Sequence, residues 1–342
     1  MAIQTVCGEI SEKQLGTTLA HEHILIDLRC VVEEPQTGKD VFYEKLSLSN
    51  RYRVYNDPYT LYDNAFIDNV EIAIQELKLY KQAGGTSIVD ATLDEIGRDP
   101  LQLKHIAEQS GVNIIMGCGH YVDAALPVNV HNATVKELAE EMIQDITIGV
   151  RETGIKAGVI GEIGTSEQIT PAERKLLTAA GIASAQTGKA VHVHTALYKE
   201  NGFDVIETLK RQNMATNKIA INHIDVKLRE DYILKLLDMG VYVEFDNFGK
   251  EFYIFSKGNR DLTERFAYDL ERVQLLVKLV EKGYLNQILI TNDICLKSML
   301  CAYGGNGYGH ILNTVKAMLL NCGLSERQLQ TLLVDNVAEF LK

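Results

Sequence analysis

The chain has 342 residues, 46% of them hydrophobic and 23% charged, which is typical of a globular protein with a large buried core. This length fits two ordinary domains or one large α/β barrel. The net charge of −12 argues against nucleic acid or an anionic membrane as the main partner, so an anionic substrate would need a local basic pocket.

The six cysteines are far apart in the sequence and form no CxxC pair. This spacing is typical of reduced thiols in a cytoplasmic protein and not of a disulfide framework. The first residues show no basic segment followed by an apolar run, and no segment approaches the ~20 apolar residues of a membrane span. We therefore expect a cytoplasmic protein with no membrane partner.

The first quarter of the chain predicts few regular elements. Residues 1–16 are expected to form a lead-in with a small hairpin across the bottom of a barrel, and a strand follows at 17–23. The segment 28–62 has no clean period and is long for a connection, which favours a functional loop or lid. A helix is predicted over 64–83, where apolar residues recur at helical spacing and two glycines follow.

From residue 86 onward, apolar strands alternate with helices. The predicted strands lie at 86–92, 112–118, 157–163, 190–195, 219–223, 241–246 and 287–293. The predicted helices lie at 100–110, 134–153, 171–187, 203–213, 229–239, 269–282, 311–320 and 325–341. With the strand at 17–23, the chain has eight strands that alternate with helices.

Apolar strands between helices indicate a parallel sheet that is covered on both faces. Eight such units match a (β/α)8 TIM barrel, so we expect an α/β fold with a single domain over residues 1–342. The alternative is an open doubly wound sheet. It lacks support, because no glycine-rich phosphate loop follows the first strand and no break in composition divides the chain.

Polar side chains gather at the carboxyl ends of the predicted strands, which meet at one face of a barrel and carry its active site. Four histidines and two carboxylates occupy those ends: His21, His23, Glu162, His194, His223 and Asp293. An H-x-H pair alone is more often a polar strand end than a pair of ligands. Six such groups in one buried place would be costly, and two divalent cations would remove that cost.

The segments that carry these residues resemble motifs of the phosphotriesterase family of the amidohydrolase superfamily. They are TLAHEH at 18–23, IGEIG at 160–164, VHT at 193–195, NH at 222–223, TND at 291–293 and YGGNGY at 303–308, in the order of the family. The resemblance extends from about Gln14 to the C-terminus. It is closest to the phosphotriesterase-homology and phosphotriesterase-related branches.

The resemblance implies a binuclear metal centre at the C-terminal face of the strands. Glu162 would bridge the two ions, in the place of the carbamylated lysine of the organophosphatases. The other ligands would be His21, His23 and Asp293 for the more buried ion and His194 and His223 for the more exposed one. We expect zinc, because imidazole and carboxylate suit it, although manganese or cobalt could substitute. The family likeness also suggests a homodimer.

Such a centre implies a hydrolase. Two ions would lower the pKa of a bridging water, and the resulting hydroxide would attack a carbonyl or phosphoryl centre. Asp293 would take the proton and pass it to the leaving group. Tyr121, which follows the strand at 112–118, would donate a hydrogen bond to the developing oxyanion.

Several further side chains near the strand ends have less certain roles. His192 is expected to be a hydrogen-bonded residue of the barrel interior and not a ligand, and His120 is a candidate for lining the pocket. Glu244 is expected to lie in the barrel interior or to support the site residues, whereas Asp246, at the end of its strand, could contact substrate. Cys295 has no obvious base, so we interpret it as a thiol on the pocket wall.

A basic loop after the strand at 241–246 bears on the substrate. It carries Lys250, Lys257, Arg260, Arg265, Tyr268 and Arg272. These cations could clamp a phosphate or carboxylate, although a solvated loop explains them nearly as well. Similar patterns occur in family branches that act on phosphorylated sugar lactones. On that likeness, Lys250, Tyr268 and Arg272 are the candidates for binding an anionic small-molecule substrate.

Three functions remain open at this stage. The leading hypothesis is a lactonase or carboxylic ester hydrolase that opens a lactone, including a phosphorylated sugar lactone. The second is an amidase on an N-acylated amino acid or small amine such as N-acyltaurine, with at most a weak phosphotriesterase activity. The third is a metal-binding protein without turnover, which the substitution Asp293→Asn would favour if metal stays bound and no activity is lost because none existed.

Overall fold

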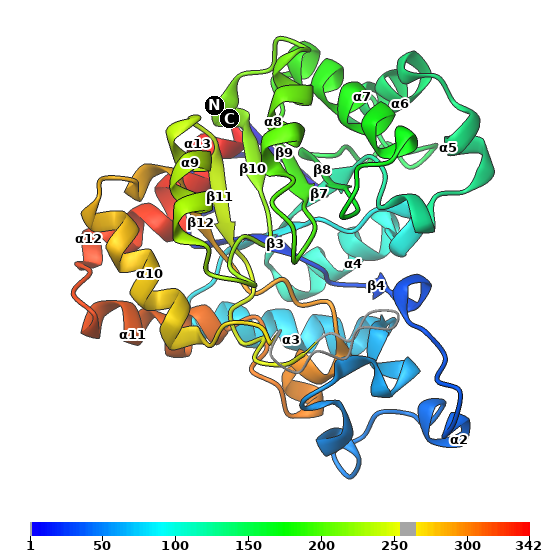
Figure 1. Cartoon of the computed structure of the whole chain (residues 1–342), viewed down its shortest axis with the longest axis vertical. Helices are drawn as coiled ribbons and strands as arrows, with labels where there is room; N and C mark the ends of the chain where they lie inside the picture. The colour runs from blue at the N-terminus through cyan, green and yellow to red at the C-terminus, as the bar shows by residue number, and fades with distance from the viewer. Residues whose placement is uncertain (1, 254–264) are drawn as a thin grey trace.

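The structure is a computed structural model that describes residues 2–253 and 265–342. Eight parallel strands surround a common core, and helices cover the outside (Figure 1). The strands are β3 (Thr18–Glu22), β6 (Ser87–Asp90), β7 (Asn113–Cys118), β8 (Val159–Gly164), β9 (Val191–His194), β10 (Ile219–Ile221), β11 (Tyr242–Phe245) and β12 (Ile288–Ile290). They are hydrogen-bonded side by side in chain order, which confirms the predicted (β/α)8 barrel.

Side chains connect β12 back to β3 at the seam of the barrel. The Glu22 carboxylate, which lies at the end of β3, accepts hydrogen bonds from Thr291 Oγ1 at 2.6 Å and from the Asn292 and Ile294 amides at 2.8 and 2.7 Å. Glu22 therefore ties the first strand of the barrel to the segment that follows the last one. No motif in the sequence predicts this role of Glu22.

The helices match the expected pattern with small shifts. The main ones are α3 (Val70–Gln82), α4 (Pro100–Ser110), α6 (Val135–Thr147), α7 (Pro171–Thr187), α8 (Gly202–Lys210), α9 (Glu230–Asp238), α10 (Asp269–Glu281), α11 (Lys316–Asn321), α12 (Glu326–Gln330) and α13 (Asn336–Leu341). π-Helical turns at Ile311–Val315 and Thr331–Asp335 lead into α11 and α13.

Two predicted helices are shorter than expected. The helix predicted over 64–83 begins at Val70, because the Asn69 side chain caps it by accepting from the Ile72 amide at 3.0 Å. The helix predicted over 134–153 ends at Thr147, close to Gly149 with its φ of +128°. Both errors concern element ends, so the strand positions that carry the functional residues are unaffected.

The bottom of the barrel is closed by both ends of the chain. The predicted hairpin is present as β1 (Ala2–Thr5) and β2 (Gly8–Ser11), followed by the short helix α1 (Glu12–Leu15). One buried cluster joins Ile3, interior barrel side chains such as Ala220, and Phe340 of α13. Lys342 Nζ lies 3.2 Å from a Glu12 carboxylate oxygen. The interior below the strand ends is therefore a packed core and not a channel.

The opposite, C-terminal face of the barrel is covered by loops with short elements. These are β4 (Ile26–Asp27), β5 (Phe66–Ile67), α2 (Lys39–Phe42), α5 (Val128–Asn132) and single 3₁₀ turns, four of which lie between Arg29 and Ala65. The segment predicted as a functional loop thus has local structure, and Leu46, Val54 and Leu61 form a small core of their own against Tyr303.

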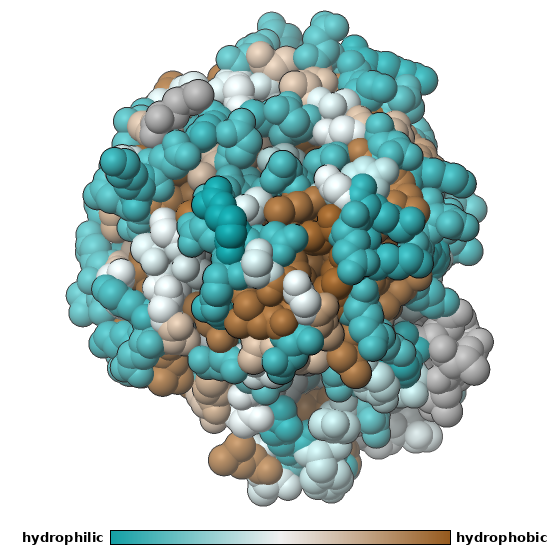
Figure 2. Space-filling view, turned by 90° about the vertical axis from the view of Figure 1, so that its left-hand side faces the viewer, coloured by the Kyte–Doolittle hydropathy of each residue, from teal (hydrophilic) through white to brown (hydrophobic). Residues whose placement is uncertain are grey.

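The outer surface is mainly polar. Figure 2 shows the side of the molecule on which α10, α11 and α12 lie, where hydrophilic residues surround one apolar hollow. In the described part of the chain, no helix is both long and apolar enough to cross a membrane.

Candidate metal centre

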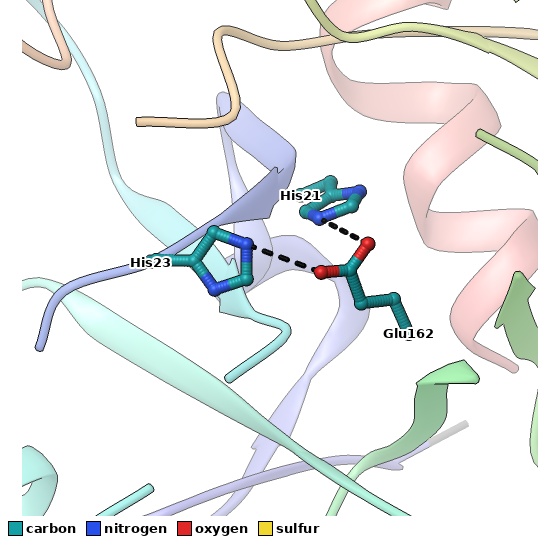
Figure 3. Close-up of side chains that lie close together, drawn as sticks. All are labelled: His21, His23 and Glu162. Carbon is teal, nitrogen blue, oxygen red and sulfur yellow. Dashed lines mark ion pairs between the residues drawn. The ribbon is translucent and has the colours of Figure 1, made fainter. Parts of the chain in front are cut away.

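The two histidines at the end of β3 face the same carboxylate. The Nε2 atoms of His21 and His23 each lie 3.4 Å from an oxygen of Glu162, which projects from β8 (Figure 3). Asp293 Oδ1 lies 3.2 Å from His23 Nε2 and 3.8 Å from His21 Nε2. Alternation along a strand explains why His21 and His23 point the same way. These four side chains form a compact, buried donor set.

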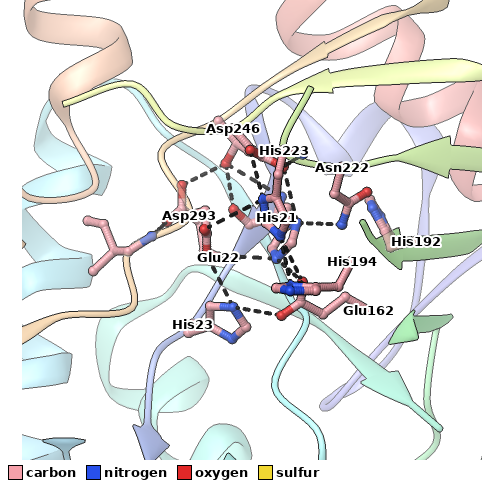
Figure 4. A network of polar contacts seen from close by, with 12 residues as sticks. His21, Glu22, His23, Glu162, His192, His194, Asn222, His223, Asp246 and Asp293 are labelled. Atoms are coloured by element: carbon pink, nitrogen blue, oxygen red, sulfur yellow. Dashed lines mark hydrogen bonds and ion pairs between the residues drawn. The ribbon is translucent and has the colours of Figure 1, made fainter. Parts of the chain in front are cut away.

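A second donor set shares Glu162. Its Oε2 atom lies 3.2 Å from His194 Nδ1 and 3.4 Å from His223 Nε2, and these two nitrogens are 2.9 Å apart (Figure 4). Glu162 therefore lies between a His21/His23 group and a His194/His223 group. The structure brings all six predicted ligand residues into one cluster.

The unsatisfied atoms of this cluster are suited to cations. His21 Nε2 and Asp293 Oδ1 are buried and have no hydrogen-bond partner in the described residues. Buried polar atoms are normally satisfied, and leaving them bare costs free energy. Imidazole nitrogens and carboxylate oxygens are the donors that zinc and related ions prefer. The residues present thus fit the divalent ions implied by the family resemblance.

Neighbouring side chains orient the histidines of the β3 end. His21 Nδ1 lies 3.1 Å from Glu244 Oε2. It also lies 2.9 Å from the side-chain oxygen of Asn222, when the Asn222 amide is oriented so that its nitrogen donates to Glu244. His21 Nε2 therefore faces the cluster. His23 Nδ1 lies 2.9 Å from Thr92 Oγ1. His192 also contacts Glu244, at 3.3 Å, and is fully buried in the barrel interior as predicted.

Asp246 orients His223 in the same way. Its Oδ1 atom lies 3.1 Å from His223 Nδ1, and its Oδ2 atom accepts from the His223 amide at 2.9 Å. The expectation that Asp246 touches substrate is wrong, because the residue is fully buried behind His223. The backbone of two ligand candidates is strained: His223 and Asp293 have φ values of +61° and +48°, which residues other than glycine rarely adopt. Such strain, about 1–3 kcal/mol per residue, is characteristic of functional sites.

The electrostatics of the cluster couple its acids and bases. Burial lowers the pKa of His23, but the nearby carboxylates of Asp293 and Glu162 outweigh it and raise the pKa to about 9. Burial also opposes protonation of His223, yet Asp246 raises its pKa to about 10. Burial lowers the pKa of His194 despite the charge of Glu162. Burial raises the pKa of Glu162, but His21 and His194 outweigh it and hold the pKa well below its usual range.

A small cavity of about 70 Å³ opens onto the cluster. Its walls combine apolar side chains with Tyr59, Tyr121, Lys250 and Cys295. Tyr121 Oη lies 3.4 Å from His194 Nδ1, so the hydroxyl is at the edge of the donor set. Burial raises the pKa of the Cys295 thiol to about 12, which fits a protonated wall residue. Asn247, which also lines the cavity, was not predicted from the sequence, because no local motif marks it.

The residues predicted to bind an anion have separate locations. Lys250 lines the cavity and is buried, with its ammonium against Asp293 Oδ2. Tyr268 is 44% exposed and stacks under the Arg265 guanidinium, outside the cavity lining. Lys257 and Arg260 lie outside the described residues. Of the three principal candidates, only Lys250 faces the metal cavity.

Arg272 has a structural environment that does not suit substrate binding. It is fully buried, with Nε 3.0 Å from Asp225 Oδ2 and Nη1 3.1 Å from Asp269 Oδ1. Its Nη2 donates to the Lys250 carbonyl at 3.1 Å. Asp225 Oδ1 in turn accepts from Asn247 Nδ2 at 2.7 Å. Arg272 therefore holds the loop that carries Asn247 and Lys250, and a substrate cannot reach its guanidinium.

We expect Arg272→Met to lower the free energy of unfolding by about 3–5 kcal/mol, because it leaves the buried Asp225 without its cation. Thermal or urea unfolding would measure this loss. Arg174→Met is the matched control: Arg174 makes a partly exposed pair with Asp204, and its loss should cost less than about 1 kcal/mol. Equal losses in the two variants would contradict the assigned role of Arg272.

His120 does not line the cavity. Its Nδ1 atom lies 2.6 Å from Glu95, and Glu141 approaches Nε2 at 3.5 Å. Burial opposes protonation, but these carboxylates raise the pKa of His120 to about 9. His120 therefore belongs to an ion-pair group in which the Glu95 side chain is buried and that of Glu141 is exposed.

Comparison with known proteins gives one consistent result. The model of the phosphotriesterase family matches residues 1–341. The chain is 34% identical to the N-acetyltaurine hydrolase of Xenopus tropicalis and 33% identical to a phosphotriesterase-related protein of Nematostella vectensis, and each comparison covers 99% of this chain and 97% of the relative.

Two solved structures are similar over nearly the whole chain. The crystal structure of a resiniferatoxin-binding protein from Rhodobacter sphaeroides has a TM-score of 0.95 and 30% identity, and covers 100% of this chain and 95% of that one. The phosphotriesterase homology protein from Escherichia coli, complexed with phosphate in its active site, has a TM-score of 0.79 and 29% identity, with 96% and 99% coverage.

Proposed function

Because the chain belongs to the phosphotriesterase family of metal-dependent hydrolases, whose members are binuclear metal enzymes, we propose that it cleaves the amide bond of a small N-acylated amine with an anionic end. The six clustered side chains would hold the two ions, and zinc is the metal we propose from their donor types. Bound there, the ions would acidify a water and polarise the carbonyl oxygen of the substrate. A homodimer remains a further expectation.

The observation that carries this proposal is the position of Lys250. It is the one Lys or Arg among the described residues that line the metal cavity, and the remaining walls are largely apolar. An ammonium has three donors, so Lys250 can contact Asp293 and still bind the anionic end of a substrate. The relatives named N-acetyltaurine hydrolase support a short acyl amide that ends in a sulfonate.

The other residues have separate roles in this proposal. Asp293 would take a proton from the attacking water and deliver it to the leaving amine nitrogen. The Tyr121 hydroxyl would donate to the carbonyl oxygen as negative charge develops on it. Leu28, Phe252 and Phe266 would exclude bulk water from the acyl group.

A phosphorylated lactone, the leading expectation from the sequence, has less support. Two of its three proposed contacts, Tyr268 and Arg272, lie away from the metal cavity. The relatives named for an activity act on an amide. Amide hydrolysis, the second hypothesis from the sequence, is therefore the one we adopt.

The test compares N-acetyltaurine with N-acetylethanolamine, a neutral analogue that has a hydroxyl in place of the sulfonate. We expect metal-reconstituted protein to favour the anionic amide. Lys250→Met should lower kcat/KM for N-acetyltaurine about 10- to 100-fold more than for the neutral analogue, since one charge-assisted hydrogen bond is lost.

The ratio of the two substrates is the measurement that matters, because Lys250 also contacts Asp293 and its loss can lower both rates. An equal loss for both amides would remove the anion-binding role of Lys250. Turnover of a phosphorylated lactone with none of either amide would overturn the proposed function itself.

A further inference from the structure

A second and larger cavity, of about 570 Å³, lies on the other side of residues 247–250, a short segment that follows β11. Asn247 and Lys250 of this segment line the metal cavity, whereas Phe248 and Gly249 line the second one, and Phe252 lines both. None of the six clustered metal-ligand candidates lines the second cavity. Its volume lies within the range of roughly 300–1,000 Å³ that is typical of sites for organic ligands.

The walls of this second cavity are suited to an apolar body. They include Phe248, Met299 and Met318, and methionine adapts its shape to many ligands. At the rim, Tyr55 and Tyr268 are 63% and 44% exposed. Large aromatic side chains gathered around one opening are a common feature of binding sites.

The acidic side chains of the cavity are already satisfied by neighbours. Asp269 Oδ2 lies 2.6 Å from His310 Nε2, and Asp269 Oδ1 accepts from the Gly249 amide at 2.8 Å and from Arg272 Nη1 at 3.1 Å. Glu251 accepts from the Asp269 amide at 3.2 Å. These carboxylates therefore have structural partners and offer no strong reason to attract a cation.

Arg51 is different, because its charge has no counterion among the described residues. In residues 2–253 and 265–342, its one hydrogen bond runs from Nη2 to the Ser298 carbonyl at 3.4 Å, and its buried Nε has no partner. An arginine that lines a cavity without a carboxylate partner is a site for an anion, since the guanidinium binds carboxylates and sulfonates through paired hydrogen bonds.

We propose that this second cavity binds one amphipathic organic anion. Its carboxylate or sulfonate would contact Arg51, and its apolar body would pack against Phe248, Met299 and Met318. Binding would be independent of the metal cavity, although the occupant would contact the back of the loop that carries Lys250. The inference does not depend on which amide the metal centre cleaves.

The test uses two fluorescent probes with the full chain. 8-Anilinonaphthalene-1-sulfonate is an amphipathic anion, and N-phenyl-1-naphthylamine is its neutral counterpart without the sulfonate. We expect the wild-type protein to bind one equivalent of the anion. Arg51→Gln should weaken the anion about tenfold or more and change the neutral probe by less than about threefold.

Two cavity-filling variants locate the probes. Met318→Trp places a larger ring in the second cavity at a half-buried position and should weaken both probes about tenfold or more. Leu197→Trp, on the wall of the metal cavity, is the matched control and should weaken neither. Circular dichroism would verify that each variant is folded.

The opposite results would overturn the proposal. If Arg51→Gln and Met318→Trp bind the anionic probe as the wild type does, the probe is on another surface. If Leu197→Trp removes binding and Met318→Trp does not, the anion occupies the metal cavity. Equal weakening of both probes by Arg51→Gln would exclude recognition of the charge.

Discussion

Glu162→Gln is expected to lower kcat by about 10³-fold or more and to reduce bound metal from two ions per chain to one or fewer. The Glu162 carboxylate lies within 3.4 Å of a ring nitrogen of each of His21, His23, His194 and His223. The substitution replaces one carboxylate oxygen by an NH2 group. It therefore removes the negative charge and one acceptor atom that the two donor sets share. Elemental analysis of metal-replete protein and amide hydrolysis rates would measure both effects.

Glu76→Gln is the control for this experiment. Glu76 is also a buried carboxylate, but it accepts from the Cys301 and Ala302 amides at 3.0 and 2.8 Å, away from the cluster. Its substitution should leave the metal content at two ions, whatever it does to stability. Glu162→Gln protein that keeps two ions and loses less than about tenfold in kcat would show that Glu162 does not bridge.

The barrel itself could be predicted because its signal is repetitive. Each apolar strand is followed by a helix, and the eight repeats restrict the topology even where single ends are misplaced by several residues. The strand-end rule then identifies His21, Glu162 and His194 without knowledge of any contact. The same rule identifies His223 and Asp293, although β10 and β12 end two and three residues before them.

The partners of charged side chains could not be predicted in the same way. Arg272 is an arginine beside the basic loop, as expected of a residue that binds an anionic substrate. In the structure it instead forms a buried ion pair with Asp225, which lies 47 positions earlier in the chain. Asp246 likewise ends a strand and yet serves His223 instead of the cavity. Whether a charge faces a ligand or another side chain depends on packing, which hydrophobic periodicity does not encode.

Arg51, which has no counterion among the described residues, also shows that the partners of a charged side chain cannot be predicted from the sequence. It belongs to a segment, 28–62, that has no regular period and that the sequence marks only as a functional loop or lid. Only the folded chain shows that Arg51 lies beside a cavity whose other walls come from residues 54–55, 248–252, 268–270 and 292–318. A single 3.4 Å hydrogen bond to Ser298 is its one contact of this kind in the described residues, so its function depends on tertiary packing.

Asp293→Asn is expected to lower kcat for amide hydrolysis about 10²- to 10⁴-fold, which is the usual contribution of a positioned general acid or base. Asp293 Oδ1 lies 3.2 Å from His23 Nε2, so the substitution also removes charge from the more buried donor set. Burial raises the pKa of Asp293, but Lys250 and the histidines outweigh it and hold the pKa far below its usual range. The Asp293 carboxylate is therefore ionised at neutral pH.

A change of leaving group separates the two roles of Asp293. An alkylamine needs a proton to depart, whereas p-nitrophenolate does not. If Asp293 delivers that proton, Asp293→Asn should lower amide hydrolysis at least about tenfold more than hydrolysis of p-nitrophenyl acetate, with metal content measured on the same samples. Equal losses would restrict Asp293 to holding metal. Absence of turnover of both substrates by the wild type, with metal still bound in Asp293→Asn, would favour a metal-binding protein without turnover.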